Sequence, residues 1–399
     1  MNTEEKRANT TIKDSLKAQR KMSGVILMQI GADTTEFSWI LNLAFFAFII
    51  IMSLYGQRIQ MWQWLKQIEA GVYELKKLST KSREIAIEAF KRFGKDEVEI
   101  GEDLDRWMDY FTIMPVDLDP AGVLKRLDHI LDERRDRFVE FVEEAAPEAS
   151  VSDRQSLENT IEVTQVLNLI FRIVRHFYIL GKKTNSQLVI MQVQMQLPEI
   201  MMLAKAYFDA IDAFSENKPI GDGIGPLIVT KLAREYGGTP DNYVDDLSRE
   251  VGYYEVDVEG RTVYAVRATG PGGTVGKPGL AIKKLVEDKG KIARIITIDA
   301  ALKLEGENMG RVSEGTGAAI GDPGPEKFAI ENAATENEIA IEAIVIKEDE
   351  AAAVGVMDKR VLDSVPEAIK RIKTAIRKRT KPGDKIILAG IGNTIGIGL

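Results

Sequence analysis

A tract without a single charged side chain, residues 37–56, constrains this chain more than any other feature. It is long enough to cross a hydrocarbon core of roughly 30 Å as one helix. Trp39 at one end and Tyr55, Trp62 and Trp64 at the other suit the aromatic belts of a bilayer. A buried core helix is the alternative, whereas a cleaved signal peptide is disfavoured because the tract begins late and no small-residue cleavage site follows it. The tract therefore predicts one uncleaved transmembrane helix, with the lipid bilayer as a partner.

Charges that flank the tract indicate which side of the membrane the body of the chain occupies. Asp33 and Glu36 precede the tract, and several basic residues follow it, among them Arg58 and Lys66. Because positive charge gathers on the cytoplasmic side, this asymmetry favours a single-pass protein of the cell membrane with a cytoplasmic C-terminal body. Basic residues in the N-terminal tail weaken the asymmetry.

Composition excludes several kinds of chemistry. A net charge of −8 argues against a nucleic-acid partner. The absence of cysteine excludes disulfides, thiol catalysis and cysteine metal sites. The chain has two histidines, His129 and His176, both in its N-terminal half, and His176 has no cluster at metal-ligand spacing beside it. We therefore expect no cofactor and no metal, and chemistry in the C-terminal half that proceeds without imidazole.

Helical periodicity dominates residues 57–216, which follow the tract and a polar N-terminal tail at 1–36. From Ile59 to Leu78 apolar residues recur at helical spacing, which predicts a stalk helix that continues out of the tract. A helical domain with further helices is expected to follow. The residues expected in its core are the stripe Leu157, Ile161, Val166, Leu169, Ile173 and Phe177. An apolar stripe on a stalk packs more often on a partner helix than on a cofactor. We therefore expect a homo-oligomer formed through the stalk and the helical domain.

The composition changes at Asn217, because most of the chain's 33 glycines and most of its β-branched runs follow it. Strands are expected at residues 253–258, 262–268, 294–298, 343–346 and 385–389. Helices are expected at residues 227–236, 280–289, 325–336 and 366–379. Strands that alternate with helices predict, for residues 217–399, a three-layer α/β domain with a largely parallel sheet.

Asp299 follows Arg294–Ile298, which has the β-branched, apolar pattern of a strand buried on both faces. In open α/β sheets, ligands gather at the carboxyl ends of the strands, so an acid at that place is a candidate for chemistry. The alternative is that Asp299 caps a helix that begins at Ala300. The glycine-rich sequence around it and a second acid, Asp222, favour the functional interpretation.

Four glycine-rich segments interrupt the strands and helices, at residues 220–226, 269–279, 314–324 and 389–398. Glycine is required where φ must be positive or where the backbone approaches another group closely. A loop of this kind that opens a helix can hold an anion with its amides, although neither the Walker nor the Rossmann pattern is met. Ordinary tight turns are the alternative. The residues expected to contact a ligand are Gly270, Gly272, Gly273, Thr274, Gly315, Gly317, Gly321 and Asn393.

Two segments resemble the superfamily of hydrogenase maturation proteases and spore germination proteases. Gly221–Pro226, which leads into a helix, looks like the acid-containing loop of that superfamily. Ile296–Leu302, with the glycine-rich loop after it, is similar to the second acidic strand end of the germination protease. The resemblance implies that Asp222 and Asp299 act as an acid protease pair.

The order of these segments departs from the superfamily, because no strand directly precedes Asp222. Lys385–Asn393 looks like the missing first strand and its GxGN turn. This resemblance implies a circular permutation, which returns Asn393 to a place beside Asp222.

Over its full length the chain is similar to an archaeal membrane-anchored family of unknown function. The similarity is carried by Tyr55–Arg58 after the tract, Met195–Pro198 within a helix, the loop Gly270–Gly276 and the final segment Gly390–Gly396. It implies the same architecture but brings no activity with it.

Three functions remain open from the sequence. A close pair of carboxylates holds one proton, so one acid can activate water while the other protonates the leaving group. This predicts a membrane-tethered, peptidase-like hydrolase whose substrate is a peptide or protein. The α/β domain can instead bind a small anionic ligand, or the helical half can act as an oligomeric membrane scaffold. A lesser alternative is an oxygen-only Mg²⁺ or Ca²⁺ site built from Glu305, Glu307, Glu314 and Asp322.

Overall fold

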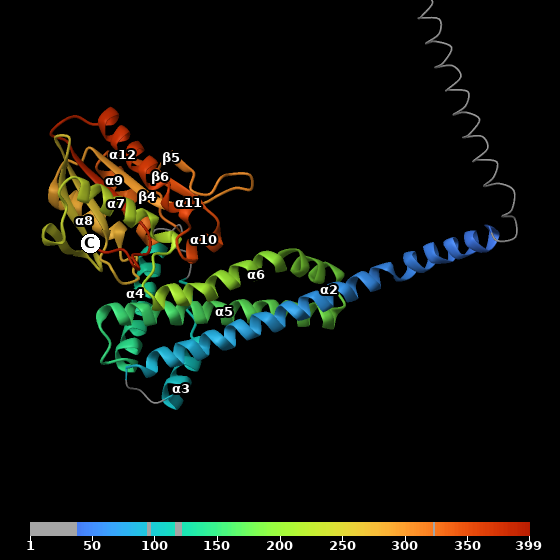
Figure 1. Ribbon diagram of the computed structural model, residues 1–399. Helices are drawn as coiled ribbons and strands as arrows, with labels where there is room; N and C mark the ends of the chain where they lie inside the picture. The colour runs from blue at the N-terminus through green and yellow to red at the C-terminus, as the bar shows by residue number, and fades with distance from the viewer. Residues whose placement is uncertain (1–37, 94–96, 116–121, 322–323) are drawn as a thin grey trace, which may run out of the picture. The chain divides into compact units, whose positions relative to one another are not determined.

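The computed structural model of the chain describes residues 38–93, 97–115, 122–321 and 324–399 (Figure 1). The chain divides into two compact units between Gln67 and Ile68. In the first unit the described residues, 38–67, all belong to helix α2 (Ser38–Lys91). The tail expected at residues 1–36 lies outside the described residues, as does Phe37.

Helix α2 contains most of the tract that we expect to cross a membrane. Its apolar side chains are exposed there, with Leu43 and Phe46 each 64% exposed. By length and composition alone, one described helix, α5 (Val151–Thr184), is apolar enough to cross a membrane by itself. The segments Ile40–Ile50 and Tyr55–Lys91 pass the same test only together, as a bent pair. The described chain therefore has one helix that meets this test, or two if the bent pair is one span.

The helical part of the second unit consists of α2 from Ile68 onward, α3 (Glu97–Met108), α4 (Val123–Ala145), α5 and α6 (Gln187–Ser215). Its core joins four helices, because Phe90 of α2, Leu104 of α3, Val142 of α4 and Leu157 of α5 lie in one cluster and are at most 4% exposed. Burying a side chain of this size stabilises the fold by roughly 1.5–3 kcal/mol. The apolar faces of these helices thus define one small helical core.

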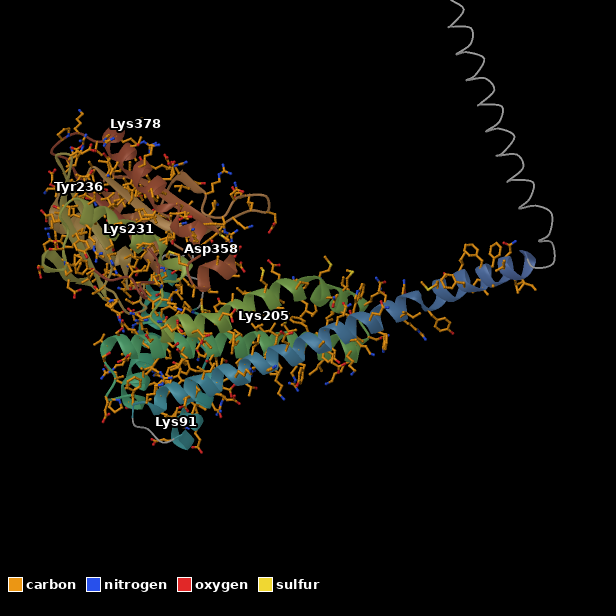
Figure 2. The ribbon with its side chains drawn as sticks, in the orientation of Figure 1. Lys91, Lys205, Lys231, Tyr236, Asp358 and Lys378 are labelled. Carbon is orange, nitrogen blue, oxygen red and sulfur yellow. The ribbon has the colours of Figure 1, made fainter. Side chains whose placement is uncertain are left out.

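Helices α5 and α6 run side by side (Figure 1). A capping box between Ser150 and Asp153 begins α5, and Asn185, with a φ of 52°, ends it. Gly181 lets the two helices approach, since a Cβ there would lie 2.8 Å from Ile190 Cγ1. Helix α6 is also held to α2, because Lys205, labelled in Figure 2, lies 3.1 Å from Glu74.

The second half of α5 corrects an expectation. We expected Leu169, Ile173 and Phe177 in the core, but their exposed fractions are 56%, 47% and 42%. Of the expected stripe, Leu157 and Ile161 in the first half of α5 are buried in the helical core. Periodicity identifies an apolar face correctly but does not say whether another element covers it.

The C-terminal part contains one seven-stranded sheet in the order β1-β2-β3-β7-β4-β6-β5. The strands are β1 (Tyr243–Ser248), β2 (Val251–Val258), β3 (Arg261–Ala268), β4 (Arg294–Leu302), β5 (Val312–Thr316), β6 (Ala340–Glu348) and β7 (Lys385–Gly390). The pairs formed by β3, β7, β4 and β6 are parallel, whereas β1, β2 and β5 pair antiparallel.

The expectation of a largely parallel sheet is therefore wrong, because the sheet is mixed. Residues of β1 and β5 were not expected to form strands, and both lie at the edges. Strands β2 and β3 pair antiparallel because a two-residue turn joins them, with positive φ at Glu259 (56°) and Gly260 (80°). Only the central strands follow the parallel pattern of alternating strands and helices.

Helices cover both faces of the sheet, which gives the three layers that the sequence predicts. Helices α7 (Ile224–Glu235) and α12 (Val365–Arg379) pack on one face, and α8 (Pro278–Lys289) and α9 (Pro325–Glu336) pack on the other. The first core contains Ile296 and Leu388 of the sheet, and the second contains Ile295 and Ile387. Short helices η1 (Gly221–Gly223), η2 (Pro240–Asn242), α10 (Glu350–Val354) and α11 (Lys359–Leu362) occur in the connections.

Candidate active site

The candidate site lies where the central strand β7 ends. The parallel strands β7, β4 and β6 have their carboxyl ends at the same edge of the sheet. Strand β7 ends at Gly390, opposite Ile298 of β4, whereas β4 continues beside β6 as far as Leu302. Asp299 is therefore the first residue of β4 beyond the end of β7.

Asp299 lies inside strand β4, which continues beyond the end expected from sequence at Ile298. The alternative that it caps a helix is wrong, because residues 300–302 are strand. Its side chain is 5% exposed and accepts hydrogen bonds from the amides of Ala300 at 2.8 Å and Gly321 at 3.1 Å. Two backbone amides thus hold this buried carboxyl in place.

The start of helix α7 brings Asp222 to the same edge. A Cβ at Gly225 would lie 2.2 Å from the carbonyl oxygen of Ile391 and 2.5 Å from that of Ile298. Only glycine allows this backbone to approach the ends of β4 and β7 so closely. The short helix η1, which contains Asp222, directly precedes this contact.

Asn393 lies beside Asp222. Its backbone amide donates to Oδ2 of Asp222 at 2.7 Å. The neighbouring Gly392 has a φ of 130°, and a Cβ there would lie 1.9 Å from the carbonyl oxygen of Asp222. The turn after β7 therefore depends on glycine to bring Asn393 to the acid.

The two aspartates interact electrostatically. Burial raises the pKa of Asp299 well above its ordinary value, and the negative charge of Asp222 raises it further, while the amides of Ala300 and Gly321 lower it. Burial also raises the pKa of Asp222, against the lowering effect of the Asn393 amide. Each acid therefore favours a proton, and the pair as a unit holds one more readily than two separate carboxyls would.

Glu348, the last residue of β6, is a third acid of this edge that sequence reasoning missed. It is 1% exposed, and both its carboxyl oxygens are buried without a hydrogen-bond partner. Burial first, then the negative charges of Asp222, Asp349, Asp299 and Asp358, raise its pKa to about 8. The sequence contained a signal, because Ile344, Ile346 and Glu348 alternate onto one buried face of the strand.

The glycine-rich loop at residues 270–274 is packed tightly by other parts of the chain. The hydroxyl of Thr394 lies 2.8 Å and 3.0 Å from the carbonyl oxygens of Gly272 and Thr274. Asn159 of α5 donates to the carbonyl oxygen of Gly273 at 3.0 Å. A Cβ at Gly270 would lie 2.2 Å from the carbonyl oxygen of Ile397. Close packing explains these glycines, and their contact with a ligand stays a prediction.

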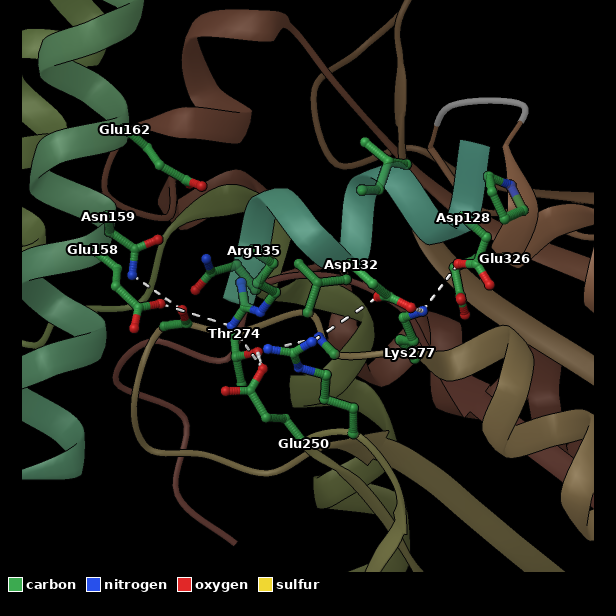
Figure 3. Close-up of a pocket in the computed structure, with 17 residues that line it drawn as sticks. Asp128, Asp132, Arg135, Glu158, Asn159, Glu162, Glu250, Thr274, Lys277 and Glu326 are labelled. Atoms are coloured by element: carbon green, nitrogen blue, oxygen red, sulfur yellow. Dashed lines mark hydrogen bonds and ion pairs between the residues drawn. The ribbon is translucent and has the colours of Figure 1, made fainter. Parts of the chain in front are cut away.

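A cavity of about 240 Å³ adjoins this loop (Figure 3). Its wall includes side chains of α4 and α5, the loop residues Gly273 and Thr274, and Asn393. Figure 3 shows Arg135 and Thr274 converging on Glu250, to which they donate at 2.7 Å each. Asn393 thus lines the cavity while its backbone amide holds Asp222.

The cavity wall has a surplus of negative charge. Six carboxyl side chains line it, against three basic ones. Each basic side chain already forms an ion pair, since Arg135 lies 2.7 Å from Glu250, Arg249 lies 2.7 Å from Asp136, and Lys277 lies 2.9 Å from Asp128. Burial raises the pKa of Glu158 in this wall to about 7, against the lowering effect of Arg135. Such a wall favours a positively charged or neutral ligand over an anion.

The family comparison covers nearly all described residues. Residues 42–217 match the family model described as "Protein of unknown function (DUF1512) N-terminal domain". Residues 220–398 match the model described as "Domain of unknown function (DUF1512) C-terminal". The chain belongs to the DUF1512 family. None of the curated proteins is a significant match for it.

Three further predicted ligand residues of this DUF1512 chain lie at different places. Gly321 contacts the acid pair, because its amide donates to Asp299. Gly315 lies in the edge strand β5, paired with Ala343, and Gly317 forms the positive-φ turn after that strand, at 105°. The structure therefore brings only Gly321 of these three to the acids.

Acids and histidines are the candidate metal ligands of this DUF1512 chain, because it has no cysteine. Within residues 38–93, 97–115, 122–321 and 324–399, no group of three or more such side chains is arranged to hold a metal ion. Two of the four acids of the alternative Mg²⁺ or Ca²⁺ site are Glu307 and Asp322. Glu307 accepts a hydrogen bond from the amide of Leu304 at 2.8 Å and so caps a turn, whereas Asp322 lies outside the described residues.

Proposed function

We propose that this chain is a membrane-anchored, peptidase-like hydrolase that uses Asp222 and Asp299 as an acid–base pair. The observation that carries the proposal is that two buried carboxyls lie at the end of β7, with Asp222 held by the amide of Asn393 and Asp299 held by the amides of its neighbours. Besides burial, the charge of Asp222 also raises the pKa of Asp299. Carboxyl pairs of this kind activate water without histidine or metal. The resemblance of both acidic segments to the germination protease superfamily favours the same reaction.

In the proposed reaction, the ionised member of the pair takes a proton from water. The water oxygen then forms a bond to the carbonyl carbon of a peptide, and the C–N bond breaks. The protonated member of the pair donates its proton to the leaving nitrogen, so the pair again holds one proton. Asn393 and Gly321 position the two carboxyls through the hydrogen bonds that their backbone amides donate.

The cavity beside Asn393 is the proposed substrate entrance. Its surplus of carboxyl groups favours a peptide with positively charged side chains near the cleaved bond. For the same reason, we rank a small anionic ligand below a peptide.

The experiment compares cleavage of a diverse peptide library by the purified full chain and by Asp222→Asn and Asp299→Asn. Each variant should reduce the rate about a hundredfold or more, because one carboxyl can no longer transfer a proton. Asp363→Asn, an exposed aspartate of the same domain, is the matched control and should retain the wild-type rate. Equal cleavage by wild type and both active-site variants, or no cleavage by the wild type, would overturn the proposal.

Anchoring forms part of the same proposal. The uncharged tract at residues 37–56 is the proposed single transmembrane segment, with the body on the cytoplasmic side. Exposed apolar side chains such as Leu43 and Phe46 support it, because a bilayer would cover them.

A second candidate function is an oligomeric membrane scaffold. It is favoured by the exposed stripe of Leu169, Ile173 and Phe177 on α5, together with Leu188 (60% exposed) and Met195 (73% exposed) on α6. Contiguous exposed apolar patches mark interaction sites. We propose that copies of this chain associate through this stripe and the stalk.

A further inference from the structure

Within the described chain, Glu348 combines deep burial with the absence of a hydrogen-bond partner. It ends β6 with 1% of its surface exposed, and neither Oε1 nor Oε2 has a hydrogen-bond partner. A buried ionised carboxylate without a partner is strongly destabilising, so such a group is retained as a neutral acid. A merely structural position would be filled more favourably by an apolar side chain of the same size.

Besides burial, the negative charges of four aspartates raise the pKa of Glu348. Asp222 of η1 and Asp299 of β4 belong to the candidate site, and Asp349 and Asp358 begin the short helices α10 and α11. Asp358, labelled in Figure 2, is ionised at neutral pH, because Arg360 lowers its pKa to about 2. All four neighbours therefore oppose a negative charge on Glu348.

Glu348 contacts the segment that contains Asp222. A Cβ added to Gly221 would lie 2.5 Å from Oε2 of Glu348 and 2.2 Å from the carbonyl oxygen of Ala352. The Glu348 carboxyl therefore lies directly against the residue before Asp222.

We propose that Glu348 is a positioning residue of the acid site, which remains uncharged so that the proton shared by Asp222 and Asp299 can pass to the leaving group. This role rests on the proposed hydrolase function. If Glu348 lost its proton to solvent, the added negative charge would raise the pKa of the pair, and the protonated member would no longer donate its proton readily to the leaving nitrogen. The neutral state of Glu348 thus keeps the protonated member of the pair able to act as an acid.

The first test is the pH profile of peptide cleavage by the full chain. Wild type should lose activity about tenfold per pH unit above about 8, where Glu348 ionises. Glu348→Gln, which is neutral at all pH values, should lack this alkaline decline. Glu348→Met is a second neutral variant, for the case in which Gln disturbs folding, and should also lack the decline. Glu350→Gln, an exposed acid two residues on, is the control and should keep the wild-type profile.

The second test needs no substrate. Because the pKa of Glu348 is raised on folding, its contribution to stability is fully present at low pH and is lost as the pH rises through about 8. Thermal unfolding of Glu348→Gln should therefore depend less on pH between about 5 and 8 than that of wild type.

The outcomes separate the two proposals. Cleavage by Glu348→Gln with an unchanged alkaline decline overturns the positioning role and leaves the hydrolase in place. If the wild type cleaves no peptide but the unfolding temperature of Glu348→Gln depends less on pH, the hydrolase and the positioning role are both overturned. The neutral state of Glu348 is then still supported. Identical unfolding profiles of wild type and Glu348→Gln overturn the inference directly.

Discussion

The backbone amide of Asn393 donates a hydrogen bond to Oδ2 of Asp222 at 2.7 Å, although 171 positions separate the two residues in sequence. The contact joins the turn after the central strand β7 to the start of helix α7. It means that the segment after β7 forms one side of the candidate site. A substitution in that segment can therefore test the backbone turn without replacing either aspartate.

Replacing Gly392 with Ala should disrupt the site. The residue has a φ of 130°, and the added Cβ would meet the carbonyl oxygen of Asp222, which is backbone and cannot move aside easily. We expect a loss of at least about 2 kcal/mol in the free energy of unfolding, measured by urea titration. Gly398→Ala is the matched control, because a Cβ there meets nothing within 4 Å. Equal stability of the two variants would contradict the described turn.

Glu158 should make the stability of the chain depend on pH. Its pKa is raised from 4.5 to about 7 on folding, mainly by burial, so its contribution is fully present below pH 4.5 and is lost as the pH rises through about 7. Glu158→Gln should equal wild type near pH 4.5 and exceed it by up to about 3 kcal/mol at pH 8. Unfolding curves across this range measure the difference. Glu148→Gln, an exposed acid, should show no such trend, and a flat difference for Glu158→Gln would refute the expectation.

Charges introduced into the proposed anchor should release the chain from membranes. Leu43→Asp combined with Phe46→Asp places two carboxylates within the uncharged tract, at a cost of roughly 2.5–3.5 kcal/mol each in a bilayer core. Sedimentation of membranes from cells that make the full chain, followed by carbonate extraction, measures the bound fraction. Tyr73→Asp, an exposed position further along α2, is the control and should remain membrane-bound. A wild-type chain extracted by carbonate would exclude the anchor.

Polar substitutions on the exposed face of α5 should separate associated copies. Leu169→Ser, Ile173→Ser and Phe177→Ser together remove the exposed stripe without opening the core, because each of these side chains is more than 40% exposed. We expect a lower mass by light scattering in detergent and little change in unfolding temperature. Val151→Ser, at a 71% exposed position outside the stripe, should keep the wild-type mass. An unchanged mass for the triple variant would argue against this interface.

Local patterns predicted much of the architecture, because β4 and β7 are short, apolar, β-branched runs and helix α12 has a clear apolar face. The edge strands β1 and β5 were missed, since Tyr243–Ser248 and Val312–Thr316 are short and rich in polar residues. Their antiparallel pairing, with the β2–β3 turn, makes the sheet mixed.

The candidate site was partly accessible from sequence. Asp222, Asp299 and Asn393 were singled out by motif, and the structure brings these three together. Glu348 was missed because its significance depends on burial and on neighbours from other segments. The cavity was missed for a similar reason, since Arg135, Glu250 and Lys277 meet only after α4 packs against the α/β domain.

Strand β7 occupies the middle of the sheet but follows the other six strands along the chain. During synthesis on the ribosome, β3 and β4 therefore emerge without the neighbour that later lies between them. Until residues 385–393 have left the exit tunnel, the nascent chain lacks the amide that holds Asp222. The hydrogen bond between Asn393 and Asp222 therefore forms only after translation has passed this point.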